Sequence, residues 1–317
     1  MMKSKTIALF ILLTILILIP FGKALHAAPP TQSQINLNNS SVTTQVANNI
    51  DFDFSIYMPI ILQGSFSITS PTTMVRIHSG QFEMGCDQDK SYESCSGNEL
   101  PLHQVNLDSF YIDLHEVTNG QYAQCVEDWF CDPPDSSSSR TRSSYYDNPT
   151  YANYPVIYVS WYDANDYCTW VGKRLPTEAE WEKVSRGTLY NRMYPWGNEK
   201  PNCALTNFRD ESGNCIGDTT QVGSYFMGAS PYGVLDMAGN VMEWVADWYS
   251  SDYYDSFPVD SWPPNPTGPT LGSYMVVRGG GFADFWGEVR TANRDIAIPS
   301  TRNLDYLGFR CASSIWD

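Results

Sequence analysis

Eight cysteines, none of them in a Cys-x-x-Cys pair, set the tightest limit on how this chain can fold. That spacing is typical of zinc clusters and thioredoxin-type redox sites, so its absence argues against both classes. An even number of cysteines in an exported protein predicts four disulfides. The sequence does not fix the pairing, but the short-range pairs Cys86–Cys95, Cys125–Cys131 and Cys203–Cys215 would leave Cys168 and Cys311 as the long-range pair.

The first 28 residues have the pattern of an export signal. Lys3 and Lys5 precede an apolar run over residues 7–20, and small residues follow as far as Ala28. The run is short for a membrane span, so we expect a signal peptide over residues 1–28, with a retained anchor as the alternative. Either interpretation places the body outside the cytoplasm, secreted or at the cell surface, with no membrane attachment beyond this segment.

The charge balance is strongly acidic, with a formal net charge of −16. Removal of residues 1–28 would take away three lysines and no acidic residue. Such a surface repels phosphate backbones and anionic lipids, so we expect no nucleic-acid partner. It is better suited to divalent cations.

Residues 29–71 are rich in Ser, Thr, Asn and Gln and are predicted to form a low-complexity spacer. Its one apolar patch, over residues 54–64, could supply a docked strand. The domain proper is expected over residues 72–317, interrupted by a long polar loop over residues 132–150.

Three short helices are predicted by the same capping signal. The sequences "TNGQ" from Thr118, "SWYD" from Ser160 and "TEAE" from Thr177 each place an acid or amide three residues after a hydroxyl. Elsewhere the chain has turns, short stretches of strand character, ten Trp and twenty Tyr, with only 17% charged residues. This composition indicates a single irregular α+β domain braced by disulfides, with little regular secondary structure.

Several longer blocks carry a family resemblance. In order, they include "MVRIHSGQFEMG" (74–85), "DLHEVTNGQYAQC" (113–125), "GVLDMAGNVMEW" (233–244), "VVRGGG" (276–281) and "LGFRCA" (307–312). Over residues 72–314 the chain resembles the formylglycine-generating enzyme, or sulfatase-modifying factor, family. The resemblance implies that family's α+β fold, which is related to C-type lectins, and a disulfide between Cys168 and Cys311.

The resemblance also exposes a departure. Catalytic members carry two copper-binding cysteines after the glycine turn, and the matching positions here are about Asp284 and near Trp286 or Gly287. Because thiolates are the ligands that hold Cu(I), neither copper nor a catalytic residue of that kind is expected. A second family disulfide would join the positions of Ser185 and Thr291, and both cysteines are missing there.

Family members bind two calcium ions, so the resemblance implies one or two structural calcium sites. The first maps to the side chains of Asp236 and Glu243 and the carbonyls of Gly239 and Val241, a spacing of hard oxygen ligands that suits Ca²⁺. The alternative is that Asn240 and Glu243 cap turns and pair with arginines.

The second calcium site maps to the side chains of Asn207 and Asn214 and the carbonyls of Phe208 and Ile216. We expect it to be weak, since Asn214 stands where the family has an aspartate.

The loop after the glycine turn supplies a candidate ligand-binding groove: Asp284, Phe285, Trp286, Arg290 and Arg294. The two exposed rings would suit stacking on a peptide or a sugar, and packing into a tryptophan-rich core is the alternative. For the arginines the alternative is buried pairing with carboxylates.

Other chemistries have weaker signals. The three histidines that follow residue 28 have no paired spacing and are expected to be structural.

From the missing cysteines, the calcium ligands and the groove loop together, we predict a calcium-stabilised, non-catalytic binding domain for a peptide or glycan, and infer no oligomeric state. The alternatives are an oxidase acting on protein cysteine through altered residues, and a purely structural domain.

Overall fold

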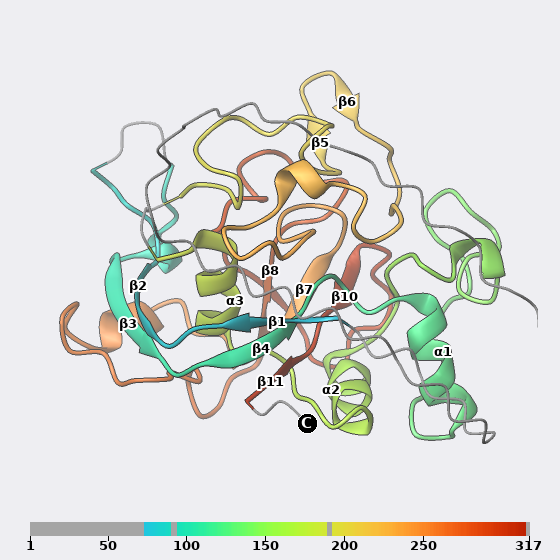
Figure 1. The fold of residues 1–317 in the computed structure, drawn as a ribbon, viewed down its shortest axis with the longest axis horizontal. Coiled ribbons are helices and arrows are strands. Elements are labelled where there is room, and N and C mark those ends of the chain that lie inside the picture. The colour runs from blue at the N-terminus through green and yellow to red at the C-terminus, as the bar shows by residue number, and fades with distance from the viewer. Residues whose placement is uncertain (1–72, 90–93, 189–191, 315–317) are drawn as a thin grey trace, which may run out of the picture. The chain divides into compact units, whose positions relative to one another are not determined.

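A computed structural model describes residues 73–89, 94–188 and 192–314 (Figure 1). The predicted signal peptide (1–28), the spacer (29–71) and the strand expected within 54–64 lie outside the described residues. Within the described part of the chain, no helix combines the length and apolar character that a membrane span requires.

The centre of the fold is a four-stranded sheet in the order β10-β7-β8-β9. Its strands are β10 (Leu307–Phe309), β7 (Met242–Trp248), β8 (Met275–Arg278) and β9 (Asp295–Ala297). β10 runs parallel to β7, and the other pairs are antiparallel. Successive residues Trp244 and Val245 are both fully buried, in two different core clusters, so the sheet is covered on both faces.

A second sheet has the order β1-β4-β11, and two hairpins complete the strands. The bounds are β1 (Met74–Ile77), β4 (Phe110–Asp113), β11 (Ala312–Ser313), β2 (Gly80–Met84), β3 (His103–Leu107), β5 (Arg209–Asp210) and β6 (Gly213–Asn214). β2 pairs with β3 and β5 with β6. The segment 307–313 therefore supplies one strand to each of the two larger sheets.

All three capped helices are confirmed: α1 (Asn119–Glu127), α2 (Trp161–Trp170) and α3 (Glu178–Arg186). Each begins with the reciprocal capping bonds that the sequence predicts; for α1, the Gln121 amide donates to the Thr118 hydroxyl at 3.3 Å. Residues of α1 and α2 pack in the core cluster of Trp244, whereas α3 packs in that of Val245. The described residues also form short 3₁₀ helices at Gly97–Glu99, Pro149–Tyr151, Phe226–Gly228 and Tyr253–Ser256.

The four disulfides form as expected: Cys86–Cys95, Cys125–Cys131, Cys168–Cys311 and Cys203–Cys215. Cys168–Cys311 joins α2 to the turn between β10 and β11, across 143 residues. Every cysteine of the chain is paired, so none carries a free thiol.

Candidate functional site

The glycine-rich turn that follows β8 positions the candidate groove loop. Gly279 and Gly280 adopt φ of +91° and +65°, and a Cβ on Gly280 would lie 2.9 Å from the Glu288 carbonyl oxygen. Only glycine fits this turn without strain. Past it, the half-buried Asp284 accepts a hydrogen bond from the Gly281 amide at 2.8 Å, and burial raises the pKa of its carboxyl. The Asp284 carboxylate therefore holds the loop in shape.

The next two residues present their rings at the surface. Phe285 and Trp286 are 39% and 38% exposed, so neither ring is a core side chain. The Arg209 guanidinium lies 4.7 Å from the centre of the Phe285 ring, and the Lys200 ammonium 5.9 Å from that of Trp286. Both contacts lie within the range of cation–π attraction.

Trp286 forms one wall of an open hollow of about 290 Å³. The hollow is lined by Lys200, Pro201, Phe208, Asp210, Glu211, Ser212 and Trp286. One aromatic wall, an ammonium, two carboxylates and a hydroxyl give it stacking and hydrogen-bonding capacity together. Such a mixture can orient a polar ligand while covering one of its faces.

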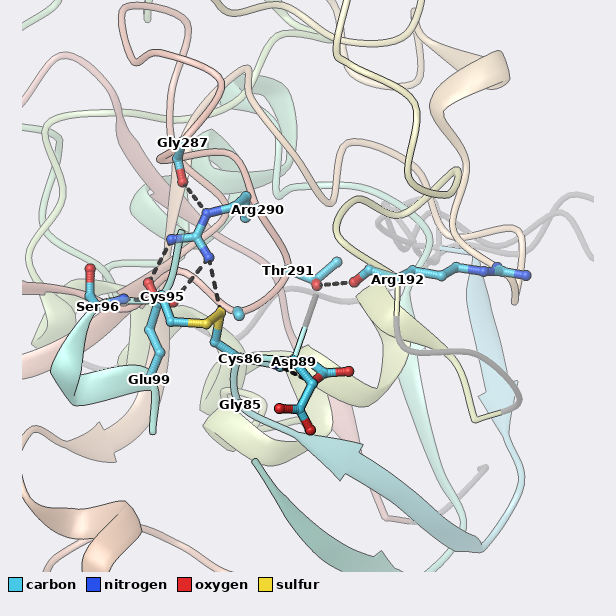
Figure 2. Close-up of a disulfide and its surroundings, with 12 residues drawn as sticks. Gly85, Cys86, Asp89, Cys95, Ser96, Glu99, Arg192, Gly287, Arg290 and Thr291 are labelled. Carbon is cyan, nitrogen blue, oxygen red and sulfur yellow. Dashed lines mark hydrogen bonds and ion pairs between the residues drawn. A yellow bond between two sulfur atoms is a disulfide. The ribbon is translucent and has the colours of Figure 1, made fainter. Parts of the chain in front are cut away.

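The candidate arginines do not line this hollow. Arg290 is buried and forms a bidentate ion pair with Glu99, at 2.9 and 2.8 Å, while its Nε donates to the Gly287 carbonyl (Figure 2). Arg294 makes the equivalent pair with buried Glu178, at 2.7 and 2.9 Å. The structure thus places both guanidinium groups in buried carboxylate pairs.

The Cys86–Cys95 disulfide lies beside Arg290. The Nη1 atom of Arg290 is 3.8 Å from the Cys86 sulfur (Figure 2). One guanidinium therefore contacts the disulfide, Glu99 and the groove loop. Among the described residues, Cys86, Cys95 and Glu99 are also the one set of three His, Cys, Asp or Glu side chains close enough to hold a metal ion together. The disulfide and the Arg290 pair already occupy their ligand atoms, so we assign them a structural role.

The residues expected to bind the first calcium ion have different surroundings in the structure. The Glu243 carboxylate accepts hydrogen bonds from Arg310 at 2.7 and 2.6 Å and from the Trp181 indole at 2.8 Å. Gly239 and Val241 are buried in the turn that leads into β7, with Gly239 at φ +73°. Glu243 therefore has the arginine partner that the sequence left as an alternative.

Asp236, by contrast, lies near a carboxyl that the sequence analysis missed. Glu116 is fully buried; its Oε1 accepts a hydrogen bond from Asn240, and its Oε2 has no partner. Burial, followed by the charge of Asp236, raises the pKa of Glu116 well above its ordinary value, and burial likewise raises the pKa of Asp236. Two buried carboxyls with an unsatisfied oxygen fit a hard cation such as Ca²⁺. The available signal was an acid in the block "DLHEVT", three residues after the end of β4 at Asp113.

The second calcium set lies around the β5–β6 hairpin. The Asn207 Nδ2 donates to the Asp218 carbonyl at 2.8 Å, and its buried Oδ1 has no partner. The Phe208 carbonyl accepts from the Cys215 amide, whereas Asn214 and Ile216 are exposed. One unsatisfied oxygen and a carbonyl fit a cation, but with fewer fixed ligands than the buried carboxyl pair.

Two of the three histidines among the described residues have contacts to the backbone or to a ring. The Nδ1 atoms of His103 and His115 lie 2.8 and 3.0 Å from the backbone carbonyl oxygens of Pro101 and Glu116. The ring of His103 also stacks on Trp262, with 3.9 Å between ring centres. These contacts are those of structural side chains.

Comparisons with known proteins agree with this architecture. A family model described as the sulfatase-modifying factor enzyme 1-like domain matches residues 63–315. The formylglycine-generating enzyme of Streptomyces coelicolor is 32% identical over 286 residues, which cover 75% of this chain and 88% of that protein. The structure of PvdO from Pseudomonas aeruginosa superimposes with a TM-score of 0.62 at 28% identity, over 76% of this chain and 94% of that one.

A serine/threonine-protein kinase, pkn1 of Chlamydia pneumoniae, is 38% identical over 254 residues. The match covers 77% of this chain but only 38% of the kinase. The chain therefore spans less than two fifths of that relative.

Proposed function

This chain belongs to the sulfatase-modifying factor family, and we propose that it binds a peptide or glycan at the hollow beside Phe285 and Trp286 without oxidising a cysteine. The observation that carries the proposal is the groove loop itself. Where catalytic relatives place copper-binding thiols, this loop has a carboxylate bonded to its own backbone and two half-exposed rings.

The state of the cysteines supports a non-catalytic role. All eight are joined in disulfides, so no thiolate is available to bind Cu(I) in the groove. Four disulfides also favour an oxidising compartment, in agreement with the proposed export of the chain.

The hollow supports a polar ligand with a flat face. A sugar ring or a peptide plane could stack on Trp286, while Lys200, Glu211 and Ser212 supply donors and acceptors at the rim. The cation–π contacts of Lys200 and Arg209 hold their charges over the rings, so the binding face is organised before the ligand arrives.

We further propose calcium as a structural brace, held by Glu116 and Asp236 at one site and by Asn207 at a weaker one. The unsatisfied Glu116 Oε2 and Asn207 Oδ1 support this assignment. The ion would neutralise the buried carboxyl pair and fix the turn that leads into β7. The ion would be a structural element, without a part in chemistry.

Ligand binding is tested by screening the purified full chain against peptide and glycan arrays, alongside Trp286→Ala. Phe226→Ala is the matched control, because Phe226 is also an exposed ring, 74% accessible, and does not line the hollow. We expect the Trp286 variant to lose at least tenfold in affinity for the best ligand and the control to lose nothing. Equal losses in both variants would contradict the proposed site.

The oxidase alternative is tested on the same preparation, by incubation with a sulfatase-type cysteine peptide and by elemental analysis for copper and iron. We expect no aldehyde and no stoichiometric redox metal. Aldehyde on the peptide would overturn the non-catalytic assignment and make the cysteine-free loop an active site.

A further inference from the structure

A second exposed aromatic surface lies at the end of α1, on the short loop closed by the Cys125–Cys131 disulfide. Trp129 is 95% exposed and Phe130 is 51% exposed. Single apolar residues on a surface need no explanation, but tryptophan is on average one of the more buried residue types. Two adjacent rings at a loop tip are therefore informative. They are not part of the hollow beside Trp286.

The loop holds these rings in a fixed position. The amides of Asp128, Trp129 and Phe130 donate to carbonyls of α1 at 3.0–3.1 Å. Trp129 itself has a φ of +60°, a left-handed conformation that is uncommon for a bulky residue and persists where its surroundings enforce it. The disulfide and the hydrogen bonds enforce it here, so the indole is presented to solvent with little freedom of its backbone.

The α2 helix provides a second attachment. The Trp170 indole donates to the Asp128 carboxylate at 3.2 Å, which ties the loop to the neighbouring helix. The other edge is bounded by Arg302, which donates to the Pro133 carbonyl and pairs with Asp163 at 2.9 Å. This arrangement fixes the loop from both sides and leaves the indole face open.

The surroundings of the rings are acidic. Glu127, Asp128, Asp132 and Asp135 are all exposed, and the sequence has no Lys or Arg between His115 and Arg140. Arg302, which donates to the Pro133 carbonyl of the following segment, is paired with Asp163. The surface therefore combines an open indole face with excess negative charge.

From this combination we propose that the Trp129–Phe130 loop is a docking site for a Lys- or Arg-bearing segment of a partner protein. A cation over the indole face gains cation–π attraction, and the flanking carboxylates attract the same charge. Charge complementarity favours this occupant over an anionic lipid surface, which the four carboxylates repel, and over a neutral sugar, which would use the ring but not the charges.

The test measures binding of a fluorescein-labelled peptide of alternating Arg and Gly to the full chain by fluorescence anisotropy. Trp129→Ala is expected to weaken binding about five- to tenfold, in the range of a partly exposed cation–π contact. Trp129→Phe should restore part of the affinity, since phenylalanine offers a weaker face. Phe226→Ala, an exposed ring elsewhere, should have no effect. The side chain of Trp129 is almost fully exposed, so unchanged melting temperatures are expected and will confirm that the variants fold.

The charge contribution is tested separately with Glu127→Gln combined with Asp132→Asn. This variant should bind the peptide more weakly and with a shallower dependence on salt. If Trp129→Ala binds as tightly as the unmodified chain, the acidic surface attracts the peptide without specificity and the proposal is wrong. It is equally wrong if a neutral oligosaccharide or a zwitterionic vesicle binds through Trp129 and the cationic peptide does not.

Discussion

The Glu243 carboxylate is either the ion-pair partner of Arg310 or a calcium ligand, and one substitution distinguishes these two roles. Glu243→Gln keeps the shape of the side chain but leaves the guanidinium without its counter-charge. Breaking a buried pair on one side costs about 3–5 kcal/mol. We expect the lower end, about 3 kcal/mol, because Arg310 keeps hydrogen bonds to the carbonyls of Asp113 and Leu235.

The assay is thermal unfolding of the full chain in a calcium chelator. For a domain of this size, a loss of 3 kcal/mol corresponds to a fall in melting temperature of about 6–12 °C. Glu211→Gln, which removes an exposed carboxylate, is the control and should shift the melting temperature by less than about 1 °C. The double variant Glu243→Gln with Arg310→Met should lose less than the sum of the two single variants, since both remove the same interaction.

Two results would refute this reasoning. One is a Glu243→Gln variant as stable as the unmodified chain in the chelator. The other is a variant that loses only the stabilisation contributed by added calcium. The second result would show that Glu243 is a calcium ligand, as the family resemblance first implied, and not the partner of Arg310.

The remaining predictions concern stability and calcium. Replacing Cys168 and Cys311 by serine should lower the free energy of unfolding by about 5 kcal/mol, since the bond closes a loop of 143 residues; guanidinium unfolding measures this, and a loss below 1 kcal/mol would contradict it. Gly280→Ala should cost about 1–3 kcal/mol in the same assay because of its positive φ and the nearby Glu288 carbonyl. Burial lowers the pKa of Lys183 to about 8, so the folded state binds this proton less tightly than the unfolded state. Relative to Lys183→Met, the unmodified chain should therefore gain stability as the pH rises from 8 towards 10.5, and a flat difference would be inconsistent with this shift. Glu116→Gln should remove calcium-dependent stabilisation in a thermal scan, whereas an unchanged response to chelator would exclude Glu116 as a ligand.

Local signals predicted the helices because each depends on residues close in sequence. The hydroxyl of Thr177 and the carboxylate of Glu180 are three residues apart, and their reciprocal bonds form as the pattern indicates. The short disulfides follow the same logic. Once they are paired, Cys168 and Cys311 are the remaining partners.

Long-range partners were beyond such reasoning. Glu99 and Arg290 are 191 residues apart, and nothing in either segment identifies the other. The same holds for Glu116, whose neighbour Asp236 follows 120 residues later. The sequence correctly offered buried arginine pairs as an alternative, but only the folded chain shows which carboxylate each arginine uses. The hollow, too, depends on loops that are distant in sequence.

The position of residues 307–313 has a consequence for the order of events during synthesis. β10 lies beside β7 in the central sheet, and β11 lies beside β4 in the second, with Cys311 between them. A nascent chain that still lacks this segment has an unfilled edge on both sheets and an unpaired Cys168. Neither sheet can be completed, and Cys168 cannot find its partner, until residues 307–313 have been made, so the native topology forms late relative to the synthesis of β4 and β7.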